Sequence, residues 1–137
     1  MRIRATAAMG ALLWILPAFA AYGGSYELQE KCARDAREWF DRQWQDDAQP
    51  PFTVQYTNHY SQKFGTCFAV VSRTGVLPRE LLQYTHFLYD VLENREIGRV
   101  NWFDKAGRVS TNVCFVNGKP CSSLADWNEL VKPYTED

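Results

Sequence analysis

The spacing of two cysteines around one Asn-Gly pair constrains this chain most. Asn117-Gly118 lies between Cys114 and Cys121, and Asn-Gly is the strongest short-range signal for a two-residue β-hairpin turn. In such a hairpin the two cysteines stand directly opposite each other. Opposed residues in an antiparallel pair have Cα atoms about 4.5–5.5 Å apart, which is within the range that a disulfide tolerates. The spacing therefore predicts a hairpin closed by a Cys114–Cys121 bridge.

The position of a proline supports the same register. Val116 and Lys119 flank the turn and close it by hydrogen bonds, so the next pair, Phe115 and Pro120, occupies a non-hydrogen-bonded position. A proline has no N–H to donate, and at this position the strand ladder needs none. Two independent details thus agree on one pairing.

The other two cysteines, Cys32 and Cys67, are assigned to each other by elimination. Four cysteines allow three connectivities. The main rival joins Cys32 to Cys121 and Cys67 to Cys114. The favoured pairing would fix a helix to a central strand, because Cys32 lies on the apolar stripe of a predicted helix and Cys67 lies in an apolar predicted strand.

The N-terminal segment predicts export. Arg2 and Arg4 precede an apolar stretch at 5–20 that ends in Ala18-Phe19-Ala20, the three-part pattern of a cleavable secretory signal. We expect a signal peptide at 1–20, cleaved after Ala20, and a single secreted domain at 21–137. A retained membrane anchor is the alternative, but the stretch is shorter than the roughly 20 apolar residues that span a bilayer. A periplasmic or secreted location also suits four paired cysteines.

The charge balance argues against a nucleic-acid partner. The whole chain of 137 residues has 15 basic and 16 acidic side chains. Without Arg2 and Arg4 the acidic excess grows, so no basic surplus remains to neutralise phosphates. After cleavage we also expect no stable membrane span, because no second apolar segment has that length.

Two helices are predicted, one near each end of the domain. The first runs over 26–44 with Ser25 as its N-cap. The second begins after the N-cap Ser123, which forms a capping pair with Asp126, and ends at Pro133. The apolar stripe of the first helix has three- and four-residue steps and consists of Leu28, Cys32, Ala36, Trp39, Phe40 and Trp44.

Between the helices, alternating and apolar runs predict strands at 52–60, 66–72, 84–92, 97–103 and 108–116. The pattern over Thr74 to Gln83 is ambiguous, and one interpretation is a loop with one short helical turn after Pro78. The predicted fold class is therefore α+β. The N-terminal helix packs on an antiparallel sheet of about five strands, the short C-terminal helix lies at an edge, and two disulfides hold the domain together.

Three segments resemble a group of small uncharacterised secreted bacterial proteins. They are Tyr56-Thr57-Asn58-His59-Tyr60 followed by Cys67, Leu88-Tyr89-Asp90-Val91 with Glu93-Asn94, and Lys132-Pro133-Tyr134-Thr135-Glu136-Asp137. The resemblance spans most of the domain. It implies a bacterial envelope setting, and it implies no activity and no catalytic residue.

The functional hypothesis that we favour is a non-catalytic binding or interaction module of the bacterial envelope. Its partner would be an unknown envelope protein or a small ligand, held on the exposed face of the sheet, since aromatic side chains are enriched in binding hot spots. The alternative is a small periplasmic hydrolase or redox enzyme that uses His59. The candidate contact residues are Tyr56, Asn58, His59, Tyr60 and Trp102.

Signals for catalysis, metals and cofactors are weak. The chain has no Cys-x-x-Cys, Gly-x-Ser-x-Gly or His-Glu-x-x-His motif, so we assign no catalytic residue and no cofactor. His59 and His86 would converge on a metal only if their strands were neighbours, and two imidazoles without a third ligand make a poor zinc site. We therefore predict no metal.

Overall fold

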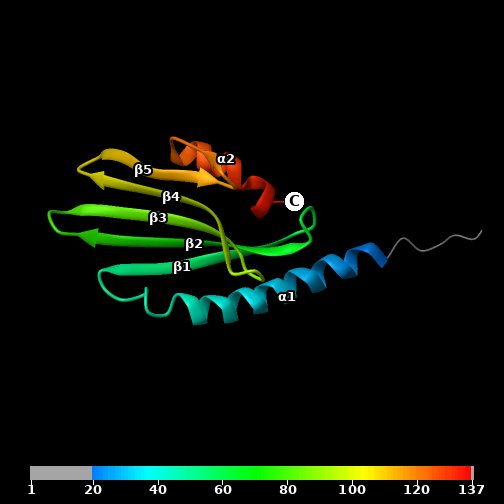
Figure 1. The fold of residues 1–137 in the computed structure, drawn as a ribbon. Helices are drawn as coiled ribbons and strands as arrows, with labels where there is room; N and C mark the ends of the chain where they lie inside the picture. Colours follow the sequence, from blue (N-terminus) through cyan, green and yellow to red (C-terminus); the bar gives the residue numbers. More distant parts are fainter. Residues whose placement is uncertain (1–19, 137) are drawn as a thin grey trace, which may run out of the picture.

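A computed structural model describes residues 20–136 of the chain (Figure 1). The predicted signal peptide lies, apart from Ala20, outside these residues. The elements in chain order are α1 (Ala20–Gln43), β1 (Phe52–Ser61), β2 (Thr66–Leu77), β3 (Leu81–Asp90), β4 (Arg95–Lys105), β5 (Arg108–Val116), β6 (Lys119–Pro120) and α2 (Leu124–Thr135).

The strands form one antiparallel sheet in which each strand pairs with the next along the chain, in the order β1-β2-β3-β4-β5-β6. Figure 1 shows this meander between α1, which runs along β1, and α2, which lies by β5 at the end with the C-terminus. The described part of the chain thus has six strands where about five were expected, because the two residues of β6 count as a strand of their own. The predicted α+β class is confirmed.

A helix packs on each face of the sheet. Consecutive side chains of a strand point to opposite faces, so one strand can contact both helices. Three buried residues of α1, and Trp44 directly after it, pack with alternate residues of β2, while α2 packs with the intervening ones. The α2 helix therefore lies on the opposite face from α1 and does not merely border the sheet. The buried core on the α1 face includes Cys32, Ala36, Trp39, Trp44, Cys67, Ala69 and Val71. The core on the α2 face includes Phe68, Leu88, Ile97, Val100, Val116, Trp127 and Val131.

Both predicted disulfides are present. Cys32 and Cys67 are bridged with their Cα atoms 5.3 Å apart. Cys114 and Cys121 are bridged across the last hairpin at a Cα distance of 4.9 Å. The register that predicted this bridge is also confirmed, since Phe115 pairs with Pro120 and the Cys121 amide donates to the Cys114 carbonyl at 3.1 Å. The first bridge fastens α1 to β2, and the second fastens the hairpin next to α2.

One predicted loop is instead a hairpin. Strand β2 continues to Leu77 and β3 begins at Leu81, so the expected helical turn after Pro78 is wrong. The chain reverses through Arg79 and Glu80, which have φ angles of 66° and 58°. Hairpin turns that need positive φ usually contain Gly or Asn. This segment has neither, and so the sequence carries no recognisable signal for the turn.

The helix ends also differ from expectation. The α1 helix begins at Ala20, so Ser25 lies inside it and is not its N-cap; the Ser25 hydroxyl instead accepts a hydrogen bond from Gln62 at 2.9 Å. In α2 the Ser123 cap is confirmed by a bond from the Asp126 amide at 3.1 Å. However, Pro133 lies within α2 and does not end it. Tertiary packing overrides the local preference there, because the last turn is packed against the sheet by Tyr134 and by Val131 in the preceding turn.

Candidate functional site

The five residues predicted to form a binding surface do not share a face. Tyr56, Asn58 and Tyr60 point to the side of the sheet that α1 covers. The Tyr56 ring lies 4.4 Å from the Phe40 ring between centroids, and the Asn58 amide approaches the Cys32 sulfur at 3.7 Å. These three side chains form part of the packing between β1 and α1, and so they do not form an exposed binding surface.

His59 and Trp102 point to the α2 side, but they are far apart on it. His59 lies in β1 opposite Phe68 of β2, whereas Trp102 lies in β4 opposite Tyr84 of β3. Both side chains are half-buried. The five predicted contact residues therefore lie in three separate places. His59 and Trp102 occupy two distant positions on the α2 face, and the other three lie beneath α1.

Trp102 belongs to an aromatic cluster with residues of β3. Its ring is stacked on Tyr84 at a centroid distance of 5.1 Å and on His86 at 5.0 Å, with interplanar angles of 10° and 19°. His86 in turn shares a hydrogen bond between its Nδ1 and the Ser72 hydroxyl at 2.8 Å. Cross-strand pairing of these residues produces the cluster, and such pairs stabilise sheets.

The Ser72–His86 pair resembles the nucleophile and the base of a catalytic triad, but the third member of a triad is missing. Burial lowers the pKa of His86 below its ordinary value of 6.5, so the neutral ring can accept the Ser72 hydroxyl proton. Among residues 20–136, no carboxylate hydrogen-bonds to His86. A triad needs such a group to orient the imidazole and to stabilise its charged form. The pair is therefore best explained as part of the packed sheet.

The lowered pKa of His86 predicts a pH-dependent stability. The unfolded chain binds a proton near pH 6.5 more readily than the folded chain does, so the free energy of unfolding should fall as pH decreases below about 6.5. Urea unfolding between pH 7.5 and 5 should show this loss. The variant His86→Gln should flatten that part of the profile. An unchanged slope in His86→Gln would contradict this assignment.

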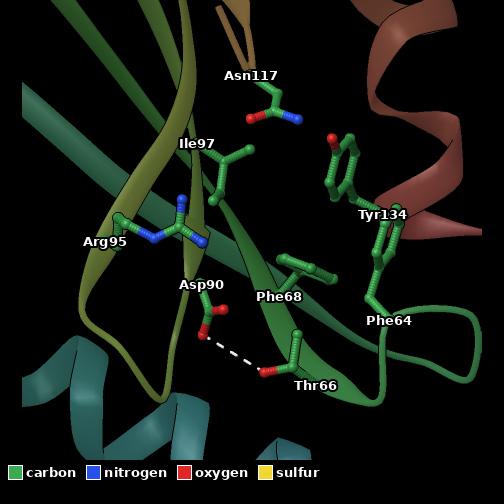
Figure 2. Close-up of a pocket in the computed structure, with 8 residues that line it drawn as sticks. All are labelled: Phe64, Thr66, Phe68, Asp90, Arg95, Ile97, Asn117 and Tyr134. Atoms are coloured by element: carbon green, nitrogen blue, oxygen red, sulfur yellow. Dashed lines mark hydrogen bonds between the residues drawn. The ribbon is translucent and has the colours of Figure 1, made fainter.

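A cavity of about 210 Å³ lies where the turns at one end of the sheet meet α2 (Figure 2). Figure 2 shows the Arg95 guanidinium, the Asn117 amide and the Tyr134 ring arranged around it, with Phe68 and Ile97 between them. Binding residues are commonly found on such turns, since a rigid scaffold positions them. The lining residues are Phe64, Thr66, Phe68, Asp90, Arg95, Ile97, Asn117 and Tyr134.

An exposed aromatic stack forms one wall of this cavity. The rings of Phe64 and Tyr134 are parallel, with an interplanar angle of 5° and centroids 4.9 Å apart. Phe68 meets both rings edge-on, at centroid distances of 5.7 and 5.1 Å. Phe64 is 44 % exposed, although it is a large apolar side chain. We call the Phe64–Tyr134 pair the aromatic ridge.

A second cavity of about 230 Å³ shares this ridge. It is lined by Phe64, Asn117 and Tyr134 as well as by Lys63, Lys119 and residues of α2. The Lys63 ammonium lies 5.3 Å from the centroid of the Phe64 ring, within the range of a cation–π contact. The ridge is thus bordered by two small hollows, with cationic side chains at their margins.

The acidic groups of both cavities are already engaged. Asp90 is only 5 % exposed, and one of its oxygens accepts bonds from the backbone amides of Leu92 and Glu93 at 3.1 and 3.2 Å and from the Thr66 hydroxyl at 3.4 Å. This carboxylate therefore holds the β3–β4 turn together. Glu129, in the second cavity, pairs with Lys132 at 2.6 Å.

Sequence reasoning missed these cavities because their residues come from segments that lie far apart in the chain. Phe64 and Asn117 lie in turns, Arg95 begins β4 and Tyr134 lies in α2, and no spacing rule connects them. The only available signal was the Asn117-Gly118 turn. Among residues 20–136 no three His, Cys, Asp or Glu side chains are placed to hold a metal ion, and no helix there has the length and apolar character to cross a bilayer.

Comparison with known proteins adds no relative. No protein-family model matches the chain, no curated protein matches its sequence, and no solved structure matches its fold.

Proposed function

We propose that this protein is a non-catalytic binding module of the bacterial envelope. Its aromatic ridge would bind a segment of a partner protein that carries an acidic side chain beside an apolar or aromatic one. The observation that carries the proposal is the exposed Phe64 ring, stacked on Tyr134 between two hollows. Exposed aromatic side chains beside an arginine are typical of the residues that dominate binding at protein interfaces.

The size of the hollows favours a protein segment over a free small molecule. The two volumes are about 210 and 230 Å³, below the roughly 300–1,000 Å³ of ordinary small-molecule sites. Each hollow is large enough for one side chain. A partner segment could place one side chain in each and lie across the ridge.

The charges around the ridge favour an acidic partner. Three basic side chains, Arg95, Lys63 and Lys119, and two acidic ones, Asp90 and Glu129, line the two hollows. Asp90 is buried and accepts bonds from backbone amides, and Glu129 forms a surface ion pair with Lys132. Arg95 donates its Nε to Glu93 at 2.9 Å and still has its two Nη groups. An incoming carboxylate would meet these donors at the margin of the apolar contact, where charges mainly steer association and set specificity.

Location in the periplasm or outside the cell is part of the proposal. The secretory pattern at 1–20 supports it, and so do the two bridges Cys32–Cys67 and Cys114–Cys121, because such bridges persist in oxidising compartments. The enzymatic alternative has less support, since His59 lines neither cavity beside the ridge.

A peptide-display selection with the purified protein tests this function. Selected peptides should combine Asp or Glu with an apolar or aromatic residue. Phe64→Ala should weaken their binding at least tenfold, the size of effect expected from a residue that dominates an interface. Val109→Ala is the matched control, because Val109 is a 64 % exposed apolar residue of β5, and it should bind as the parent does.

Two results would contradict the proposal. The first is the enrichment of no peptide family, and the second is equal binding by the parent and by Phe64→Ala. Circular dichroism and thermal unfolding of each variant will show whether the fold is retained, so that lost binding is assigned to the ridge and not to unfolding.

A further inference from the structure

A third cavity, of about 220 Å³, lies on the opposite face of the sheet from the aromatic ridge. It occupies the part of the α1 face formed by β2 to β5, and no residue of α1 lines it. Its floor is polar. Thr85 and Asn101 lie opposite each other in β3 and β4, and they are only 5 % and 7 % exposed.

The polar floor is internally ordered. The Asn101 amide nitrogen donates to the Thr85 hydroxyl at 2.7 Å and to the Tyr84 carbonyl at 3.1 Å. The Thr85 oxygen accepts the first of these bonds and keeps its own proton to donate. Buried polar groups destabilise a fold unless they form hydrogen bonds. The Thr85–Asn101 pair forms them, so the sheet holds both side chains in fixed positions.

Two arginines border the cavity, and each is held against an aromatic ring. The Arg73 guanidinium lies 3.4 Å from the centroid of Phe52, and that of Arg99 lies 4.9 Å from the centroid of Phe87. Arg99 is neutralised by Glu96, which accepts from it at 2.7 and 3.0 Å. Arg73 has no such partner. Among residues 20–136 no group accepts a hydrogen bond from its buried Nε, and no carboxylate pairs with it.

The cavity therefore has an uncompensated positive charge. None of its lining residues is acidic, and the amide side chains of Gln83 and Asn112 supply further polar groups. Buried arginine donors normally have acceptors, and a guanidinium matches the paired oxygens of a carboxylate or phosphate. We propose that this cavity binds a small oxyanion, a carboxylate or a phosphate group, on Arg73. This site is separate from the aromatic ridge and does not depend on the function proposed for it.

NMR titration of the purified protein with sodium phosphate, and separately with sodium acetate, tests the proposal. Sodium chloride keeps the ionic strength constant. The Arg73 Nε–H and the Thr85 amide signals should shift and saturate. Saturation with phosphate alone identifies a phosphate site, and saturation with acetate alone identifies a carboxylate site. Shifts that saturate with neither anion would overturn the proposal.

Matched variants separate this site from general charge effects. Arg73→Gln should weaken binding at least tenfold. Arg79→Gln removes the same charge from the exposed β2–β3 turn and should bind as the parent does. Equal binding by the two variants would overturn the proposal. If Arg73→Gln fails to fold, Arg73→Lys decides: it keeps the charge but not the planar guanidinium. Binding by Arg73→Lys should be clearly weaker than in the parent, and parental affinity would refute the assigned role.

Discussion

Replacing Cys32 and Cys67 together by alanine is expected to lower the free energy of unfolding by about 4 kcal/mol in the chain-entropy model. The bridge spans 35 residues, so its loss frees a long loop in the unfolded chain. Both cysteines are also buried, each at 2 % exposure, between α1 and β2. Urea unfolding of the parent and the double variant measures the difference.

The other bridge is the matched control for this prediction. Cys114 and Cys121 are separated by only 7 residues, so replacing both should cost about 2.4 kcal/mol in the same model. A larger loss for the short loop than for the long one would contradict the assignment of stability to loop length. In the exported protein no thiol should react with maleimide before unfolding and reduction, and reactive thiols there would contradict the proposed envelope location.

Replacing Trp127 by alanine is expected to destabilise the fold by about 3–5 kcal/mol, the usual cost of deleting a buried large aromatic side chain. Trp127 is 2 % exposed and joins α2 to the core on that face of the sheet. It packs so closely on β4 that a Cβ at Gly98 would lie 3.1 Å from its ring. The space that the indole ring leaves in Trp127→Ala could be filled by neighbouring side chains only if α2 moved.

Urea unfolding of Trp127→Ala beside Leu124→Ala tests this expectation. Leu124 is in the same helix but is 37 % exposed, so its replacement should change stability by a much smaller amount, of the order of a surface substitution. Similar losses in the two variants would show that α2 contributes through helix propensity and not through the Trp127 contact.

The sequence was most informative where one local pattern had one structural solution. The Asn117-Gly118 turn set the register of its hairpin, and that register placed Cys114 opposite Cys121. The apolar run at 66–72 likewise predicted a strand, and β2 contains it. These inferences depend on residues that lie within a few positions of one another in the chain, and such patterns can be recognised in a sequence.

Local signals failed where packing decided the outcome. Pro133 was expected to end α2, yet the contacts of Val131 and Tyr134 with the sheet hold the helix to Thr135. The turn through Arg79 and Glu80 has positive φ angles without a glycine or an asparagine. In both places the energy of the surrounding structure outweighs the preference of the residues themselves.

From the sequence alone we could predict the fold class, the Cys114–Cys121 bridge and most strands, because helix and strand periods, turn residues and close cysteine spacing act over short stretches of chain. The Cys32–Cys67 bridge followed only by elimination, and the structure confirmed it. Only the tertiary structure decided which side chains share a surface. It put Tyr56 and Asn58 beneath α1, and it brought Phe64 and Tyr134 together from positions 70 residues apart. The physical reason is that a binding surface depends on which elements pack against each other, and no local pattern in the chain records that arrangement.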